Sequence, residues 1–420
     1  MWDQLSFVVS RIREKLWIKP LIVCGLSIGA VLLADVLDMS DIGRFLPEIA
    51  EESTETLLKF MASSMLMMAT FAVASMVAAY ASASRTATPR AFPLIIGDGV
   101  SQTALSVFIG AFIYSVVALI ALVNGHYNER AGQFLLFSMT LVVLAVVIIT
   151  FIRWVDNIAR LGRVEYTIDK VEEAAAEAIR KRQSAPRLGG VAAFSPADGN
   201  RAIFGDCIGY LQHIDIAALQ SRAEASKLKV LVASLPGTFC TPNRPVAWVI
   251  PEVSGNVSDE DASRIACAFE IGDSRVFDQD PRFGLVVLSE IASRALSPAV
   301  NDPGTAIDVT HTLVRLFLLW DECGKADGVA TVKFDRVAAP ELSLADTFDD
   351  AFTGIARDGA GMVEVVVRLL KALESLAATG NSTMRDNARR HARLALVRAE
   401  NILKVPEDLT AARRAAEFAM

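Results

Sequence analysis

Residues 134–152 read FLLFSMTLVVLAVVIITFI and contain no charged side chain. A helix needs about 20 mostly apolar residues to cross a lipid bilayer, and this stretch meets that requirement. Three earlier stretches also meet it, at residues 20–37, 57–80 and 100–123. The sequence therefore predicts a membrane α-helical domain over residues 1–155 with about four transmembrane helices. We expect the first stretch to be retained, because no convincing cleavage site precedes Asp35.

Lysine and arginine are concentrated in alternate loops of this region. They precede the first stretch, separate the second from the third, and follow the fourth, whereas the two remaining loops are acidic or nearly neutral. The basic residues are Arg11, Arg13, Lys15 and Lys19, then Arg85 and Arg90, then Arg153, Arg160 and Arg163. Cytoplasmic loops carry an excess of Lys and Arg. This pattern predicts that the N- and C-termini are cytoplasmic.

Composition excludes several classes of function. The net charge of −7 argues against a nucleic-acid-binding protein, which would present a basic face. The five cysteines are far apart and form no C-x-x-C pair, so neither a zinc knuckle nor a redox dithiol is indicated. We therefore expect no metal and no cofactor, and membrane lipid as the evident partner.

The predicted spans carry no Asp, Glu, Lys, Arg or His in their interiors. Since ionisable groups inside a membrane normally mark proton relays and coupled transport, their absence argues against a proton-driven pump. The second span instead contains hydroxyl groups among small residues: Ser63, Ser64, Thr70 and Ser75. Two interpretations stay open for these residues. They line a pore, or they allow neighbouring helices to pack closely.

A proline-containing loop lies between the second and third spans. It includes Thr88-Pro89-Arg90 and Phe92-Pro93, whose prolines interrupt the helix. With its two arginines, this loop is suited to dock on the soluble domain or on lipid phosphates. The alternative is that the arginines only fix the topology.

The remaining chain has the composition of a soluble protein. We expect a connecting helix over residues 156–190, a cytosolic small mixed α/β module over 191–255, and a mostly α-helical cytosolic domain over 256–420. Two Asp-Pro pairs, Asp280-Pro281 and Asp302-Pro303, predict helix starts, because Asp is a preferred N-cap and Pro a preferred first helical residue.

Several segments resemble a bacterial family of predicted membrane proteins, the domain-of-unknown-function family 2254. The most specific segment is Arg294-Ala295-Leu296-Ser297-Pro298-Ala299-Val300-Asn301-Asp302-Pro303-Gly304-Thr305-Ala306. Others are Gly272-Asp273-Ser274-Arg275, Gln279-Asp280-Pro281, Gly209-Tyr210-Leu211-Gln212 with Ile214-Asp215, Pro236-Gly237-Thr238-Phe239, Thr88-Pro89-Arg90 and Phe108-Ile109-Gly110-Ala111-Phe112-Ile113-Tyr114. Gly304 departs from the bulkier residue usual there. The resemblance implies a topology and an architecture, and no established activity.

Polar residues gather around the two Asp-Pro pairs. They are Arg275, Asp278, Asp280, Arg294, Asn301, Asp302, Thr305, Asp308 and His311. Three interpretations compete. The residues cap helices and form buried Arg–Asp pairs, they form a ligand or anion pocket at helix N-termini, or they form a metal or catalytic site.

The sequence as a whole favours a homo-oligomeric, channel-like or transport protein that is regulated by its cytosolic domain. This interpretation depends on the uncharged spans, the small residues of the second span and the large attached domain. We expect a homo-oligomer because symmetric assembly is common for such proteins. The alternatives are a non-conducting sensor or scaffold that binds a ligand or a protein, and a membrane-bound enzyme. We expect no catalytic activity.

Overall fold

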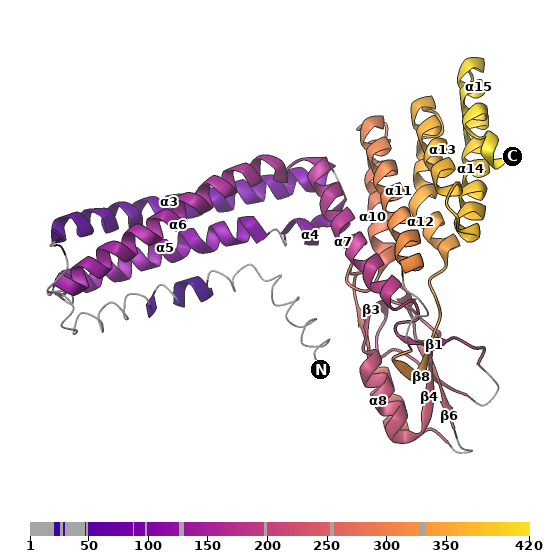
Figure 1. The fold of residues 1–420 in the computed structure, drawn as a ribbon, viewed down its shortest axis with the longest axis horizontal. Coiled ribbons are helices and arrows are strands. Elements are labelled where there is room, and N and C mark those ends of the chain that lie inside the picture. Colours follow the sequence, from indigo (N-terminus) through magenta and orange to yellow (C-terminus); the bar gives the residue numbers. More distant parts are fainter. Residues whose placement is uncertain are drawn as a thin grey trace. The chain divides into compact units, whose positions relative to one another are not determined.

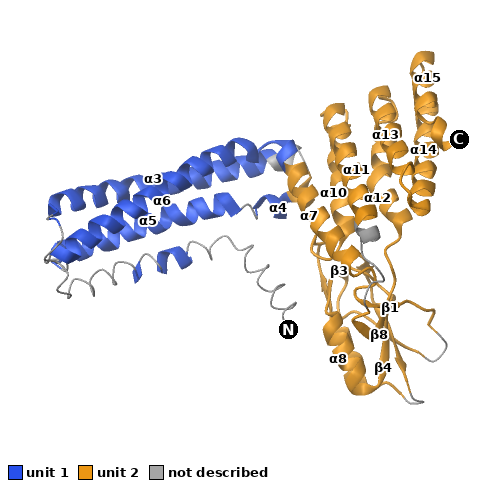
Figure 2. Ribbon diagram, in the orientation of Figure 1, with its two compact units in different colours: residues 1–85, 92–166 blue, residues 86–91, 167–420 orange. Residues whose placement is uncertain are grey.

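The computed structural model describes residues 21–25, 28–29, 47, 49–86, 88–96, 99–125, 130–196, 200–252, 256–326 and 332–420. The chain forms two compact units (Figures 1 and 2). Unit 1 comprises residues 1–85 and 92–166, and unit 2 comprises residues 86–91 and 167–420. The short segment 86–91 therefore folds with unit 2, although both of its neighbours in the chain belong to unit 1.

Unit 1 is helical in its described part. Its elements are α3 (Glu51–Thr86), α4 (Phe92–Ile96), α5 (Gly99–Val123) and α6 (Arg130–Leu161). The helices α3, α5 and α6 are long and apolar enough to cross a membrane, and they contain the predicted spans 57–80, 100–123 and 134–152. Most of the predicted first span, 20–37, lies outside the described residues. The number of four spans and the orientation therefore stay predictions.

The three long helices bury residues at a seven-residue spacing. On α5 the buried residues include Ser101, Phe108, Ser115 and Leu122, with Ala104, Ala111 and Ala118 between them. On α3 they include Leu58, Met65, Ala72 and Ala79, and on α6 they include Thr140, Val147, Trp154 and Leu161. This repeat is typical of left-handed helix packing, and small residues allow close approach of helices within a membrane.

After residues 86–91, unit 2 continues with α7 (Val164–Ser184) from residue 167 onward and with an α/β region. A five-stranded sheet has the order β1 (Gly190–Ala192), β8 (Phe334–Ala339), β4 (Leu228–Val232), β6 (Ala247–Pro251) and β2 (Arg201–Ile203). A three-stranded sheet has the order β5 (Phe239–Cys240), β3 (Gly209–Ile214) and β7 (Phe269–Gly272). In the first sheet β8 is parallel to both of its neighbours, and in the second sheet every pairing is antiparallel.

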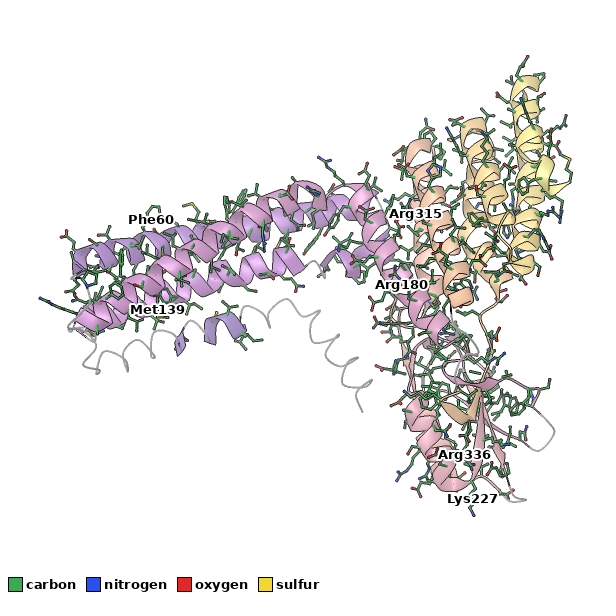
Figure 3. All side chains as sticks on the ribbon, viewed as in Figure 1. Phe60, Met139, Arg180, Lys227, Arg315 and Arg336 are labelled. Atoms are coloured by element: carbon green, nitrogen blue, oxygen red, sulfur yellow. The ribbon has the colours of Figure 1, made fainter. Side chains whose placement is uncertain are left out.

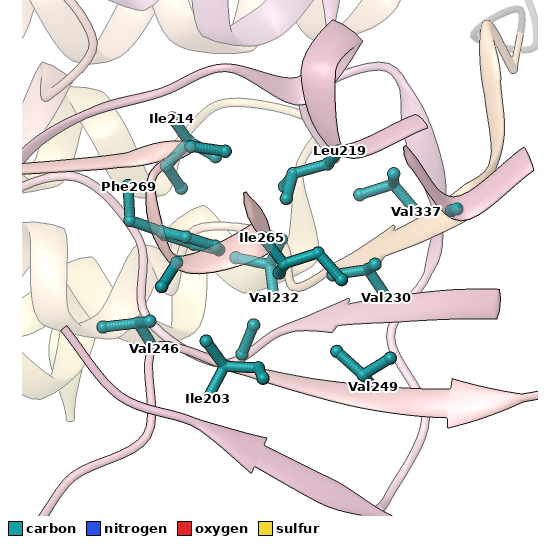
Figure 4. Close-up of a cluster of buried hydrophobic side chains, with 14 of the residues drawn as sticks. Ile203, Ile214, Leu219, Val230, Val232, Val246, Val249, Ile265, Phe269 and Val337 are labelled. Atoms are coloured by element: carbon teal, nitrogen blue, oxygen red, sulfur yellow. The ribbon is translucent and has the colours of Figure 1, made fainter. Parts of the chain in front are cut away.

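Both sheets share one hydrophobic core with the helices α8 (Ile216–Ser226) and α9 (Asp259–Ala266). Val230 and Val249 of the larger sheet, Ile214 and Phe269 of the smaller one, and Ile265 of α9 contribute to it (Figure 4). Because the core draws on both sheets, the α/β region folds as one body.

The helices of unit 2 form two rows. They are α10 (Pro281–Ala295), α11 (Pro303–Ala326), α12 (Leu344–Asp358), α13 (Val363–Ala377), α14 (Ser382–Ile402) and α15 (Pro406–Ala415), followed by a short 3-10 turn, η3 (Glu417–Ala419). Helix α10 packs on α12 and α12 on α14, while α11 packs on α13 and α13 on α15. Contacts of α10 with α11 and of α13 with α14 join the rows (Figure 1).

The structure differs from the predicted division of the soluble chain. The range 256–420, predicted as a separate helical domain, supplies α9, β7 and β8 to the α/β region predicted at 191–255. The connecting region 156–190 is also divided, since α6 extends to Leu161 and α7 begins at Val164. Strand pairing across more than a hundred residues leaves no local pattern in the sequence, so composition alone misses it.

Candidate functional site

The first Asp-Pro pair forms a buried ion pair at the start of α10. The Nε and Nη2 atoms of Arg275 each lie 2.7 Å from Oδ2 of Asp280, and Asp280 is only 2% exposed. The same guanidinium lies over the ring of Phe283, 5.1 Å from its centroid. Burial raises the pKa of Asp280 above its ordinary value, against the opposing hydrogen bond from Arg275. The aspartate side chain does not cap α10, contrary to the expectation for an Asp-Pro helix start.

A second guanidinium, which is buried, approaches from the last turn of α7. Arg182 is 5% exposed, and its Nη2 donates to the backbone oxygen of Gln279 at 3.0 Å. Burial lowers the pKa of Arg182 to about 10, while nearby Asp280 opposes that shift. Two arginines from different elements therefore share the field of one buried carboxylate.

A turn and a strand complete the surroundings of Asp280. Gly237 has a φ of +91°, and a Cβ atom added there would lie 2.2 Å from Oδ2 of Asp280, so this position requires glycine. Oε1 of Gln279 accepts a hydrogen bond from the backbone N–H of Ile214 at the end of β3, at 3.1 Å. The Gly237 turn, β3, α7 and α10 thus converge at this ion pair.

The second Asp-Pro pair caps a helix. Asp302 accepts hydrogen bonds from the backbone N–H and the hydroxyl of Thr305 at 3.1 and 2.6 Å. These bonds lower the pKa of Asp302. The preceding Asn301 has a left-handed φ of +53°, and the N–H of Asp302 donates to the backbone oxygen of Ala295 at 2.8 Å. These contacts hold the turn between α10 and α11, so the role of Asp302 here is structural.

The structure separates the predicted site residues into two groups. Arg275 and Asp280 lie at the N-terminal end of α10, and Asn301, Asp302 and Thr305 follow its C-terminal end. A helix of 15 residues is about 22 Å long, which places these groups at opposite ends. Arg294 is half-buried in the last turn of α10, and Asp308 and His311 are exposed on α11. The nine candidate residues, which include the exposed Asp278 shortly before α10, therefore do not line one pocket. Within the described ranges no three His, Cys, Asp or Glu side chains are grouped to hold a metal ion.

The proline-containing loop docks on α10. Oγ1 of Thr88 donates to Oε2 of Glu290 at 3.1 Å, and the guanidinium of Arg90 pairs with Oε1 of the same carboxylate. Thr88 and Ala91 are buried, and residues Pro89–Ala91 form a 3-10 turn. Of the alternatives left open for this loop, the structure shows docking on the soluble chain.

Helix α10 also packs tightly against two other helices of unit 2. A Cβ atom added at Gly284 would lie 2.5 Å from the Cβ of Ala175 on α7. On another side, a Cβ added at Gly354 of α12 would lie 2.8 Å from the hydroxyl of Ser293. We call this set of contacts on α10, from α7, α12 and the segment 86–91, the α10 junction.

Charged pairs reinforce the α10 junction. Nε of Arg282 lies 2.6 Å from Asp350 and its Nη1 lies 3.1 Å from Asp346. On the neighbouring helix α11, Arg315 (Figure 3) pairs with Glu172 of α7. Sequence reasoning missed Arg182, Arg282 and Glu290, because an isolated charge in a helical stretch resembles a solvated residue. The Thr88-Pro89-Arg90 motif was the only indication of this docking.

The predicted pore residues lie away from the packed interior of unit 1. Ser63 and Thr70 are exposed, and Ser64 and Ser75 are half-buried. The hydroxyls of Ser63 and Thr70 each donate to a backbone oxygen of their own helix, at 3.0 Å. Phe60 projects from the same helix and is 66% exposed (Figure 3). Ser63 and Thr70 therefore do not form the contacts between α3, α5 and α6.

Buried polar groups of unit 1 lie on α5 and α6, in addition to Thr54 on α3. Ser106 and Ser115 donate to backbone oxygens one turn earlier, at 2.6 and 2.7 Å. The hydroxyls of Tyr114 and Thr140 lie 3.1 Å apart and join the two helices. The seven-residue spacing of Ser101, Phe108 and Ser115 was the feature of the sequence that could have identified this packing face.

Comparison with known proteins identifies relatives and no activity. The sequence model of a family described as "Predicted membrane protein (DUF2254)" matches residues 13–375. Uncharacterized proteins of Mycobacterium bovis and Mycobacterium tuberculosis are 25% identical to the chain over 324 residues. The match covers 74% of this chain and 62% of each relative, so the chain spans about three fifths of their length. No solved structure matches the chain.

Proposed function

Since the chain belongs to the family of predicted membrane proteins with domain of unknown function 2254, we propose that it is a homo-oligomeric, channel-like or transport protein regulated by its cytosolic domain. In this proposal unit 2 is the cytosolic domain, both termini are cytoplasmic, and the membrane is the bacterial inner membrane. The protein has no catalytic activity and no cofactor.

The docking of the segment 86–91 on α10 carries the proposal. This segment joins the membrane helices α3 and α5 through α4, yet it is part of unit 2. The helix α7, which follows α6 in the chain, contacts the same α10 at Ala175. A ligand or partner that changes the contacts of these two segments with α10 would therefore act on both connections to the membrane helices. This arrangement gives unit 2 a direct mechanical route to unit 1.

The chemistry of the described spans supports a passive pathway. The stretches 60–80, 100–123 and 134–152 contain no Asp, Glu, Lys, Arg or His, so they offer no proton relay. The exposed face of α3 carries Ser63 and Thr70, seven residues apart. In a symmetric assembly, this face with Ser64 and Ser75 would line the axis between copies.

The second candidate function is a non-conducting sensor or scaffold. The observation that favours it is the polar structure of unit 2, where the buried Arg182 and the half-buried Arg275 lie around Asp280. The hydroxyls of Ser63 and Thr70, in contrast, donate to backbone oxygens of their own helix. Because these hydroxyls already have a hydrogen-bond acceptor in their own helix, they can face lipid as well as a pore. A membrane-bound enzyme is the third alternative, and it would require a catalytic role for Asp302 or His311.

A flux assay distinguishes these functions. The purified protein is reconstituted into liposomes, and the passage of ions and small solutes is measured against protein-free liposomes. The proposal predicts flux that Thr70→Leu reduces and that Leu66→Met, a volume-conserving change on the same helix, leaves unchanged. Absence of flux for every solute, together with saturable ligand binding, would establish the sensor or scaffold instead.

A further inference from the structure

One carboxylate fastens the whole segment Thr88–Ala91 to α10. Glu290 uses its two oxygens separately, Oε2 for the hydroxyl of Thr88 and Oε1 for the guanidinium of Arg90. The segment is a preformed turn, because the N–H of Ala91 donates to the backbone oxygen of Thr88 at 3.1 Å. Pro89 restricts the backbone of the turn further. Both of these side-chain contacts depend on Glu290, so loss of its carboxylate removes them together.

We infer that Glu290 acts as a releasable latch for the segment Thr88–Ala91, and that its release is the step by which unit 2 regulates the membrane helices. The latch follows from the contacts of unit 2 alone. Its regulatory role rests on the proposed function. In that function, release of the segment would free the connection between α3 and α5 and so act on the membrane helices.

The exposure of the contact makes it releasable. The side chains of Arg90 and Glu290 are 52% and 35% exposed, so water can solvate both charges when they separate. The ion pair of Arg275 and Asp280 differs, since Asp280 is only 2% exposed. The ion pair of the loop is therefore more accessible to water than the ion pair at the start of α10.

The packing of α10 determines which partner moves. Gly284 brings α10 against α7, and Gly354 brings α12 against α10, both at distances that leave no free space for a Cβ atom. Arg282 adds two ion pairs to α12. Since α10 is fixed on these sides, the turn leaves and the helix stays. Both units remain folded in the released state.

Limited trypsin digestion of the full chain in detergent tests the latch. Cleavage after Arg90 requires an extended segment, and Ala91 is fully buried while the turn is docked. When opening is fast, the initial cleavage rate follows the population of the open form. We expect Glu290→Gln to raise the rate of cleavage at Arg90 about fivefold, and Thr88→Val about threefold, as suits a partly exposed contact. Added salt should raise the wild-type rate in the same direction, because it screens exposed charges.

Matched variants separate release of the turn from other causes. Glu172→Gln breaks another partly exposed ion pair of unit 2, with Arg315, and should leave cleavage after Arg90 unchanged. Thr88→Val leaves the ion pair of Arg90 in place, so acceleration in this variant cannot come from a freed arginine side chain. An unchanged rate in Glu290→Gln, or acceleration in Glu290→Gln without acceleration in Thr88→Val, would overturn the latch. If both variants accelerate cleavage while no variant conducts any solute, the latch stands and the proposed function fails.

Discussion

The two units of this protein are stabilised in different ways. In unit 1 the buried positions recur along each helix at a seven-residue spacing, as with Ser101, Phe108 and Ser115, and no charged side chain is buried among its described residues. In unit 2 the decisive contacts join distant residues, such as Arg182 with Gln279, 97 positions away, and Thr88 with Glu290, 202 positions away. The stability of unit 1 depends mainly on the close packing of its helices, whereas the stability of unit 2 depends in addition on a few specific polar pairs.

This difference predicts how each unit responds to change. Replacing a single charge should have large effects only in unit 2, and only where the partner is buried. Larger side chains should destabilise unit 1 at the positions where small residues allow its helices to pack closely.

The largest effect is expected at the buried ion pair of α10. Asp280→Ala leaves Arg275 and Arg182 without their carboxylate in a buried environment, and breaking such a pair costs about 3–5 kcal/mol. We expect denaturant unfolding of the purified protein to show a loss of that size. Asp302→Ala is the matched control, because it removes an exposed N-cap worth about 1 kcal/mol. Equal losses in both variants would contradict the importance of burial.

A pH-dependent effect is expected at His391 on α14. The ring is 1% exposed, packs beside Phe348, and has Nε2 3.0 Å from Oδ1 of Asp349. Burial, followed by the charge of Arg390, lowers its pKa to about 4. In the unfolded chain a histidine has a pKa of about 6.5 and binds its proton first as the pH falls.

The unfolded form is therefore favoured increasingly between pH 6.5 and about 4. The free energy of unfolding should fall over this range by on the order of 3 kcal/mol. His391→Phe keeps the aromatic packing and removes the titration, so the difference between its pH profile and that of the wild-type protein isolates the contribution of His391. Parallel profiles would contradict the lowered pKa of His391, because they require that His391 titrates alike in the folded and unfolded chain.

An intermediate effect is expected from added volume in unit 1. Ser115 is fully buried on α5, and Ser115→Leu forces the helices apart at a cost of about 1–3 kcal/mol. Ser63→Leu adds the same volume at an exposed position of α3 and should change stability by less than about 0.5 kcal/mol. Thermal unfolding in detergent compares the two variants. A larger loss in Ser63→Leu would indicate that another surface covers that face.

The smallest effect is expected from a partly exposed pair of unit 2. The side chains of Arg315 and Glu172 are 57% and 23% exposed, and such pairs contribute at most about 1 kcal/mol. Glu172→Gln should therefore lower the unfolding free energy only slightly, and 0.5 M salt should remove the difference. A loss comparable to that of Asp280→Ala would refute the distinction between exposed and buried pairs.

The same contrast explains what could be predicted from the sequence. The long helices of unit 1 follow from their apolar stretches, which the described parts of 57–80, 100–123 and 134–152 confirm. The packing face of these helices was not predicted. From the sequence we considered the hydroxyls of Ser63 and Thr70, whereas the seven-residue spacing on α5 identifies the buried positions.

In unit 2 local patterns correctly predicted that α10 begins at Pro281 and α11 at Pro303, but they did not predict how the elements assemble. Asp302 caps its helix as its type and position predict, but Asp280 turns away from α10 towards Arg275. That choice depends on Arg182 and Gly237, which come from distant parts of the chain. The pairing of β8 between β1 and β4 and the docking of Thr88 on Glu290 are long-range in the same sense. No spacing rule within one segment predicts them.

Control of the membrane helices through the α10 junction is the central claim, and solute flux from liposomes tests it most directly. The comparison uses the wild-type protein, Glu290→Gln, Glu290→Arg, Arg90→Glu, and the double variant Arg90→Glu with Glu290→Arg, which restores opposite charges. We predict that each single variant raises flux severalfold and that the double variant returns it towards the wild-type level. Equal flux in all five proteins, or a double variant no closer to wild type than the single variants, would contradict the claim.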